Sequence, residues 1–263
     1  MKSSTVQQQI RQDFSRAAAH YDQHATVQRA VSQQLSQLVR PFLSSTGRWL
    51  DVGCGTGAFQ RDFIQCGSPK PQLFQLDGAF AMCQRAAANG CATVCADMHQ
   101  LPLANATLDG VFSSLSLQWA APMEAAILEL RRVIKSGGML AFSTLLPGTF
   151  SELEQAFHDI HETSRILHFH SAQQWEAALL AHGWRLHSSE HVMLRPSFVT
   201  AMDALRQVHV IGATAKTSPR PMTAATLRRL LKAYPLHTDS SQATPNETVQ
   251  ATYHVWLGLA LAV

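Results

Sequence analysis

Residues 47–59 (GRWLDVGCGTGAF) form a short apolar segment that ends in an acid and continues into three closely spaced glycines. A helical pattern begins directly after the glycines. A strand, a glycine turn and a helix in this order typically receive a nucleotide-like ligand, because glycine lets the backbone approach the ligand and the helix start offers free N–H groups. The segment therefore predicts a ligand-binding turn at the end of a strand.

Strand and helix patterns alternate after this turn. Because strands separated by helices of ten to fifteen residues indicate a doubly wound sheet, we expect an α/β fold with a mostly parallel sheet. In chain order, the expected elements are a helical segment at 1–46, strands at 49–52 and 72–77, a helix at 80–89, strands at 92–96 and 109–115, a helix at 123–134 and a strand at 139–145.

The pattern becomes looser in the second half of the chain. There we expect helices at 150–166 and 171–182, a strand at 184–194, helices at 198–211 and 223–234, and a last strand at 248–261. Helices between the last two strands are placed to form a lid over the sheet edge that binds ligands. We expect one domain, 1–263, made of an N-terminal helical cap (1–46), a core (47–195), a helical lid insertion (196–247) and a final strand (248–263).

Composition limits the partners and the compartment. The net charge of +3 is too small to suggest a protein that binds duplex nucleic acid. The five cysteines are odd in number and follow no signal peptide, so a reducing cytoplasm is expected. Cys91 and Cys95 lack a second Cys/His pair at zinc spacing, and the longest apolar run, 255–263, is too short to span a bilayer. We expect no metal, no membrane partner and a monomer.

Two ligands compete for the glycine turn. Gly53, Gly55 and Ala58 satisfy the nicotinamide pattern G-x-G-x-x-G/A, but Asp51 would repel a pyrophosphate. Residues 50–57 (LDVGCGTG), which include Gly57, resemble the first motif of the class I S-adenosylmethionine-dependent methyltransferases. In that family the acid lies near the methionine ammonium group. The resemblance implies a Rossmann-like fold with seven strands, the last one antiparallel. It also implies S-adenosyl-L-methionine as cofactor and S-adenosyl-L-homocysteine as product.

Further positions fit the same resemblance. Asp77 lies about 20 residues after the turn, where a carboxylate can accept both ribose hydroxyls, although a nicotinamide site would share this residue. Asp97 and Met98 resemble the pair that holds the adenine. Asp109 opens a strand and is as easily structural. The remaining cofactor contacts that the resemblance implies are Tyr21, Met82, Ser114 and Leu115.

The segments around the core narrow the family. Residues 14–25 (FSRAAAHYDQHA) closely resemble the N-terminal helix of the malonyl-acyl-carrier-protein O-methyltransferases of biotin synthesis. Four further segments resemble the same family: 115–119 (LSLQW), 143–150 (STLLPGTF), 211–214 (IGAT) and 253–258 (YHVWLG). This resemblance implies methyl transfer to the free carboxylate of malonyl-acyl-carrier protein or malonyl-CoA. The product is the methyl ester that primes pimeloyl synthesis.

The resemblance also suggests roles for individual side chains. Arg206 is the expected anchor of the substrate carboxylate, and His209 is a weaker candidate nearby. Tyr21 is expected to close over the cofactor, and Trp119 to form a wall of the transfer site. A malonyl carboxylate is already ionised at pH 7, so no general base is required.

The acyl carrier protein is acidic, so basic residues near the lid are expected to dock it. The candidates are Arg195, Arg228, Arg229 and Lys232. Two positions depart from the family, which often has a serine at the position of Ala79 and an asparagine at that of Ser114.

Two other functions are compatible with the sequence. The same fold and cofactor serve methyltransferases that act on another small carboxylate, a quinone or a polyketide intermediate. The chain could also be a noncatalytic cofactor-binding partner of a synthase.

Overall fold

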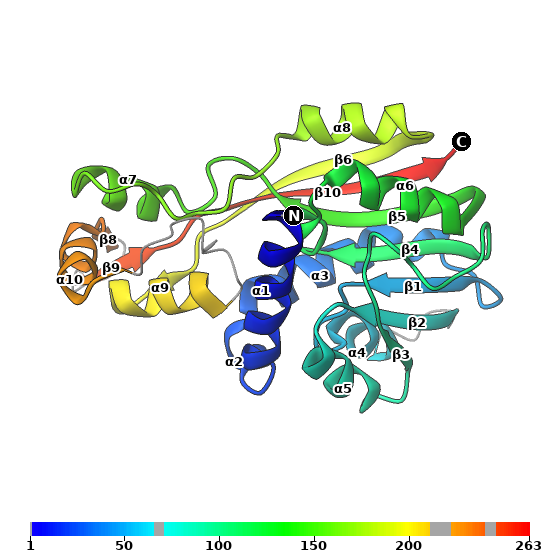
Figure 1. Ribbon diagram of the computed structural model, residues 1–263, viewed down its shortest axis with the longest axis horizontal. Coiled ribbons are helices and arrows are strands. Elements are labelled where there is room, and N and C mark those ends of the chain that lie inside the picture. Colours follow the sequence, from blue (N-terminus) through cyan, green and yellow to red (C-terminus); the bar gives the residue numbers. More distant parts are fainter. Residues whose placement is uncertain (1, 66–70, 211–221, 240–245) are drawn as a thin grey trace.

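The computed structural model describes residues 2–65, 71–210, 222–239 and 246–263. Its centre is a seven-stranded sheet in the order β3-β2-β1-β4-β5-β10-β6 (Figure 1). Neighbouring strands from β3 to β5 are parallel, whereas β10 is antiparallel to both β5 and β6. The prediction of a mostly parallel sheet with an antiparallel last strand is confirmed. The strands are β1 (Arg48–Val52), β2 (Gln72–Asp77), β3 (Ala92–Cys95), β4 (Leu108–Ser114), β5 (Ile134–Leu145), β6 (Trp184–Leu194) and β10 (Tyr253–Ala262).

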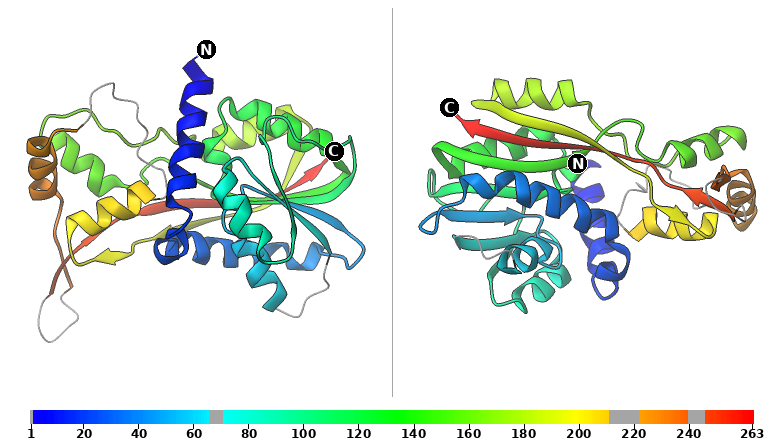
Figure 2. Two further views of the ribbon diagram at one scale, coloured as in Figure 1. Left: turned by 60° about the horizontal axis from the view of Figure 1, so that its bottom comes forward. Right: turned by 180° about the vertical axis from the view of Figure 1, so that it is seen from behind.

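Helices cover both faces of this sheet (Figure 2). Apolar residues of α3 and Phe59 of α4 join one buried cluster, while those of α6 and α8 join another on the opposite face. The helices are α1 (Lys2–Ala17), α2 (Tyr21–His24), α3 (Thr26–Val39), α4 (Ala58–Gln65), α5 (Phe80–Ala87), α6 (Met123–Val133), α7 (Ser151–Asp159), α8 (Ala172–Ala181), α9 (Ala201–Val210) and α10 (Ala224–Ala233), with short 3₁₀ turns at Arg40–Phe42 and Leu117–Trp119.

β1 is buried on both faces, and this explains its apolar sequence. Trp49 packs into the cluster under α3, whereas Leu50 and Val52 pack into the cluster under α6 and α8. A parallel strand covered by helices on both sides cannot alternate apolar and polar residues. The same burial fixes the carboxyl end of β1, and therefore the glycine turn, in the middle of the sheet.

A second, smaller sheet was not expected from the sequence. β7 (Ser197–Phe198), β8 (His237–Asp239) and β9 (Asn246–Gln250) form an antiparallel sheet in the order β7-β9-β8. Together with α9 and α10 these strands lie between β6 and β10 in the chain, at the left of Figure 1. Helix α1 runs between this part and the main sheet.

The prediction of one continuous strand at 248–261 was wrong. The chain leaves the small sheet after β9 and enters the large one at β10, with Ala251 and Thr252 between them. The Ala251 N–H donates to the carbonyl of Pro196 at 3.2 Å, and the Thr252 N–H donates to the Glu152 carboxylate at 2.9 Å. These bonds to distant segments interrupt an otherwise continuous β-rich sequence.

The predicted helix at 150–166 was also too long, because α7 ends at Asp159. His161 has a φ of 53°, in the left-handed region, and the N–H of Glu162 donates to the carbonyl of Phe157 at 3.0 Å. A left-handed residue just past the last turn closes a helix in this way.

Candidate functional site

The glycine turn has a backbone conformation that favours glycine. Gly53, Gly55 and Gly57 have φ values of 70°, 54° and 80°, which L side chains rarely adopt. The N–H groups of Gly53 and Cys54 both donate to the carbonyl of Leu76, at 2.8 and 3.0 Å. The turn is therefore bound to the end of the neighbouring strand β2 and keeps one shape.

A cavity that is open to solvent lies beside this turn. It is lined by ten of the residues that the sequence analysis singled out: Tyr21, Gly53, Gly55, Asp77, Met82, Asp97, Met98, Ser114, Leu115 and Trp119. Residues from four different strand ends and from the N-terminal helices thus meet in one place.

A second, smaller cavity lies on the other side of the turn, against α3. It shares Tyr21, Gly53, Gly55 and Ser114 with the first cavity, so the two are adjacent. Asp51 lines this second cavity. Gly57 lines neither, but a Cβ at this position would approach Asn89 to 2.6 Å, so its role is to let the turn pack against the chain.

Asp51 is the most unusual group of the site. It is 2% exposed, and its Oδ2 atom has no hydrogen-bond partner among the described residues. Burial, and next the charge of Asp77, raise the pKa of Asp51 well above its usual value. A buried carboxylate without a partner is unfavourable in its ionised form, so this position favours a ligand that brings a positive charge.

Asp77 is bound to the backbone on both sides of it. One carboxylate oxygen accepts from the Gly55 N–H at 2.9 Å, and the other accepts from the Ala79 N–H at 2.7 Å. Burial raises its pKa, while these hydrogen bonds oppose the shift. Ala79 caps α5 without any side-chain bond. The Asp77 carboxylate therefore binds the backbone N–H at the start of α5, where the family often has a capping serine.

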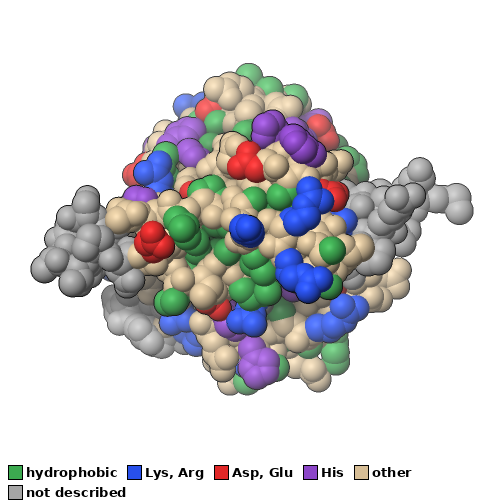
Figure 3. Space-filling view, turned by 90° about the vertical axis from the view of Figure 1, so that its left-hand side faces the viewer, with side chains coloured by type: hydrophobic (Ala, Val, Ile, Leu, Met, Phe, Trp, Pro, Cys, Tyr) green, Lys and Arg blue, Asp and Glu red, His purple; other side chains and the backbone are tan. Residues whose placement is uncertain are grey.

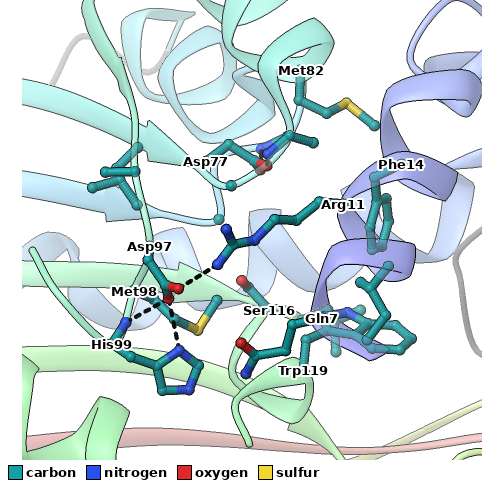
Figure 4. A pocket seen from close by; sticks show the side chains of 18 of the residues that line it. Gln7, Arg11, Phe14, Asp77, Met82, Asp97, Met98, His99, Ser116 and Trp119 are labelled. Atoms are coloured by element: carbon teal, nitrogen blue, oxygen red, sulfur yellow. Dashed lines mark hydrogen bonds and ion pairs between the residues drawn. The ribbon is translucent and has the colours of Figure 1, made fainter. Parts of the chain in front are cut away.

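Helix α1 forms a wall of the larger cavity that the sequence analysis missed. Figure 4 shows Arg11 reaching from α1 across the cavity to the carboxylate of Asp97, with which it forms an ion pair. The backbone and ring nitrogens of His99 contact the same carboxylate at 2.9 and 2.7 Å. Burial alone would raise the pKa of Asp97, but the hydrogen bonds from His99 and Arg11 hold it below its usual value.

Two more contacts from α1 support this wall. The side chain of Gln7 donates to the carbonyl of Ala121 at 2.8 Å, and the ring of Phe14 meets that of Trp119 edge to face at 5.7 Å. Only the resemblance of the segment that begins at Phe14 pointed toward this region. No sequence signal identified Gln7 or Arg11, since neither belongs to a recognisable motif.

Replacing Arg11 with methionine should loosen α1 from the core. A half-exposed ion pair of this kind contributes about 1 kcal/mol to the packing of α1 on the core. Without it, the fraction of molecules in which α1 has separated from the core should rise about fivefold. Limited proteolysis with chymotrypsin, which cleaves after Phe14 and Tyr21, measures this opening. Arg16→Met is the matched control, because the ion pair that Arg16 forms with Asp13 lies within α1. Equal cleavage of both variants would contradict the prediction.

Tyr21 and Leu115 complete the wall of the larger cavity near the turn. Burial, and next the charges of Asp77 and Asp22, raise the pKa of Tyr21, so it is a neutral hydrogen-bond donor. Leu115 has a φ of 46°, and its N–H contacts both the hydroxyl and the carbonyl of Ser143, at 2.9 and 3.1 Å. Strain at a non-glycine residue persists only where its surroundings enforce it, and such residues concentrate at functional sites.

Among the described residues that line the two cavities, neither Arg206 nor His209 is found. Both lie exposed on α9, and Arg206 pairs with Asp203 at 3.2 Å. The IGAT segment at 211–214 lies outside the described residues. Asp109 is structural in this fold, since its carboxylate accepts from Lys135 at 2.6 Å and from the Arg48 N–H at 2.8 Å. The anchor role of Arg206 stays a prediction.

Comparisons with known proteins agree with this geometry. Residues 50–142 match the family model of the methyltransferase domain. The geranyl diphosphate C-methyltransferase of Streptomyces coelicolor, whose structure contains S-adenosyl-L-homocysteine, superposes with a TM-score of 0.53 over 89% of this chain and 79% of that one, at 11% identity. The fold and the glycine turn define a class I S-adenosylmethionine-dependent methyltransferase.

Two curated relatives define the family more narrowly. The malonyl-[acyl-carrier protein] O-methyltransferase of Gallionella capsiferriformans is 34% identical over 94% of this chain and 89% of its own length. The enzyme of the same name from Herminiimonas arsenicoxydans is 43% identical over 68% of this chain and 65% of its own length. The chain belongs to the malonyl-[acyl-carrier protein] O-methyltransferase family.

Among the residues that the structure describes, no helix is both long and apolar enough to span a bilayer. Within the same ranges, no three His, Cys, Asp or Glu side chains are grouped as metal ligands would be.

Proposed function

We propose that this enzyme transfers a methyl group from S-adenosyl-L-methionine to the free carboxylate of a malonyl thioester on acyl carrier protein or coenzyme A. The product is a malonyl methyl ester for the biotin pathway. The observation that carries the cofactor assignment is the buried carboxylate of Asp51 beside the glycine turn, whose Oδ2 atom has no hydrogen-bond partner among the described residues. The acceptor follows from the names of the relatives.

The residues of the two cavities fit the parts of this cofactor. Asp77 lies at the carboxyl end of β2 and can accept from ribose hydroxyls. Asp97 and Met98 line the far side of the same cavity, as a site for adenine requires. Asp51 is placed to meet a positively charged group near the turn. When bound, this cofactor would supply an electrophilic methyl carbon on a sulfonium. The S–CH₃ bond would break as the O–CH₃ bond forms, and the sulfur would become a neutral thioether.

The chain's own residues then have to orient the acceptor and exclude water. A carboxylate attacks in its ionised form, which dominates at pH 7, so proton removal is not part of the step. Correct alignment in a dry site supplies much of the rate in such a reaction. Phe14, Tyr21, Leu115 and Trp119 surround the larger cavity with apolar and aromatic surface suited to this.

A basic surface near the lid supports an acidic carrier protein as partner. Figure 3 views the end of the molecule that carries α10, where Lys and Arg side chains gather between apolar ones. On α10, Arg228, Arg229 and Lys232 are exposed, and Arg195 is exposed after β6. Opposite charge steers association of two proteins.

We propose further that the chain is divided into four parts, with the N-terminal cap and the lid closing over the core. We also propose that the enzyme is monomeric and cytoplasmic and uses no metal.

The test of this function is direct. The protein is incubated with S-adenosylmethionine and malonyl-carrier protein, malonyl-CoA or free malonate, and mass spectrometry follows the methyl ester. We expect ester on at least one thioester. Ester on neither thioester would overturn the proposed acceptor.

Replacing Arg206 with glutamate should lower methyl transfer at least about tenfold while cofactor affinity stays unchanged. An anchor for the malonyl carboxylate acts on carrier-protein and coenzyme A substrates alike, and truncating one partner of a charge pair has an effect of this size. Steady-state kinetics on both substrates, with calorimetry for S-adenosylhomocysteine, measure the two effects.

Two control variants separate an anchor from other roles. Asp203→Asn breaks the Arg206–Asp203 pair but keeps the cation, so activity should be retained. Arg228→Glu should impair only the carrier-protein substrate. If Arg206→Glu also impairs only that substrate, Arg206 belongs to the docking surface and is not the anchor.

A further inference from the structure

Three residues that line the smaller cavity each carry a buried polar atom that no described residue satisfies. These atoms are Oδ2 of Asp51, Oε1 of Gln28 and Oγ of Ser32. Asp51 comes from the end of β1, whereas Gln28 and Ser32 come from successive turns of α3 and share one face of that helix. Ser32 is only 4% exposed, so water does not reach it freely. Buried polar atoms nearly always have hydrogen-bond partners. Three unpartnered atoms among the residues that line one cavity therefore indicate a missing partner.

The chemistry of these atoms defines the partner. A carboxylate and an amide oxygen only accept hydrogen bonds, and a hydroxyl can accept one. An ammonium group offers three donors and a positive charge, and therefore matches three acceptors of which one is an anion. A neutral or anionic group would leave the Asp51 carboxylate uncompensated.

Cations line the same cavity. Arg29 donates to the backbone carbonyl of Asp22 at 2.7 Å. Arg61 donates to the carbonyl of Thr56 at 2.6 Å and also pairs with the Asp22 carboxylate at 3.4 Å. A guanidinium has five N–H donors, so each arginine keeps capacity for a carboxylate. Acceptors for an ammonium group and cations for a carboxylate together describe a site for an α-amino acid.

The smaller cavity continues into the larger one through Tyr21, Gly53, Gly55 and Ser114. We infer that Gln28 and Ser32 of α3, together with Asp51, bind the ammonium group of the cofactor's amino-acid end, while the larger cavity takes the nucleoside. This inference rests on the proposed function for the identity of the cofactor. It adds the N-terminal segment to the cofactor site and makes α3 part of its specificity.

Ser36 provides a matched control one turn further along α3. It is buried like Ser32, but its hydroxyl donates to the carbonyl of Ser32 at 2.6 Å and is therefore satisfied within the helix. Replacing Ser36 with alanine removes a structural contact. Replacing Ser32 with alanine removes only a group that has no partner in the ligand-free protein.

Calorimetry on the full chain tests the inference with two ligands. S-adenosylhomocysteine carries the amino-acid end, whereas 5′-methylthioadenosine has the same nucleoside and lacks it. Ser32→Ala and Gln28→Met should each weaken S-adenosylhomocysteine about tenfold and leave methylthioadenosine unchanged, as expected for a lost hydrogen bond to a charged group. Ser36→Ala should change neither affinity. The Tm of the ligand-free protein should fall for Ser36→Ala and not for Ser32→Ala.

The outcomes are distinguishable. If the two variants weaken both ligands equally, or neither, α3 does not hold the amino-acid end and the inference is wrong. If the unmodified protein binds S-adenosylhomocysteine no better than methylthioadenosine, no amino-acid subsite exists. If it binds neither ligand, the proposed function itself fails. Gln28 is partly exposed, so Gln28→Met keeps the comparison available should Ser32→Ala not fold.

Discussion

Replacing Asp51 with asparagine should weaken binding of S-adenosylmethionine about 100-fold and leave the ligand-free protein at least as stable as before. The loss of affinity follows because the ammonium group would lose its buried anionic partner, and truncating one member of such a pair costs about 3 kcal/mol. The gain in stability follows because asparagine removes a buried charge that no described residue compensates.

The stability effect should depend on pH. The pKa of Asp51 is raised by burial and next by Asp77, above the value of about 3.9 expected in the unfolded chain. A raised carboxyl pKa contributes stability that is complete below that unfolded value and is lost as the pH rises through the folded pKa. The asparagine side chain of the variant does not titrate. The Tm of Asp51→Asn minus that of the unmodified protein should therefore grow between pH 5 and pH 8.

Asp109→Asn is the control with the opposite sign. Burial would raise the pKa of Asp109, but hydrogen bonds from Lys135 and the Arg48 N–H hold it below its usual value. Its stabilising contribution is therefore present at neutral pH and is lost as the pH falls through the folded pKa. Asp109→Asn should lower the Tm at pH 7 without changing cofactor affinity. A lower Tm for Asp51→Asn at pH 8 would show that Asp51 has a structural partner instead.

The second large effect is expected at Gly53. A Cβ at this position would lie 1.8 Å from the hydroxyl oxygen of Ser116 and 2.4 Å from its Cβ, and the backbone φ is 70°. Turning the hydroxyl away cannot relieve the second contact. Steric overlap and the left-handed conformation together should make Gly53→Ala about 3 kcal/mol less stable than the unmodified protein. Cofactor binding should be lost as the turn shifts.

Gly90 separates the two causes. Its φ is 81°, and a Cβ there would meet nothing within 4 Å. Gly90→Ala should therefore cost only the conformational part, about 1 kcal/mol, and should leave cofactor binding unchanged. Denaturant unfolding and calorimetry compare the two variants. Similar losses of stability in both would mean that Ser116 moves freely and that overlap at Gly53 is unimportant.

Local patterns predicted most strands of the central sheet closely, although β5 begins five residues earlier than expected, at Ile134. The bounds of β2 and β6 agree with the sequence-based ranges, and β1, β3 and β4 differ by one residue at their ends. Strands β1, β2 and β4 are short, largely apolar segments next to glycine, proline or acids, and β6 lies between Gly183 and Pro196. Neighbouring residues therefore decide where these strands begin and end. The acids at the ends of β1 and β2 could be assigned to the site for the same reason.

Other parts depend on contacts between distant segments. The break between β9 and β10 is made by Pro196 and Glu152, which are about 50 and 100 positions away from it. Arg11 reaches Asp97 across 86 positions. The sequence near residues 251–252 and near Arg11 contains no feature that announces these contacts, so no local pattern could predict them.

Gln28 and Ser32 illustrate the same limit at the site. In the sequence they are ordinary polar residues of an amphipathic helix whose apolar stripe is Val27, Val31, Leu35 and Val39. Their burial against the glycine turn depends on how α3 packs on the sheet.

The sequence by itself determined the class of fold, the ligand-binding turn and the acids around it, because these depend on a few neighbouring residues whose backbone and charge requirements are strict. Only the tertiary structure decided that α1 and α3 close the two sides of that turn. Packing between a helix and a distant strand end follows from the shape of the whole buried surface. The turn therefore predicts a cofactor site from the sequence, while the helices that pack beside the turn are known only from the folded chain.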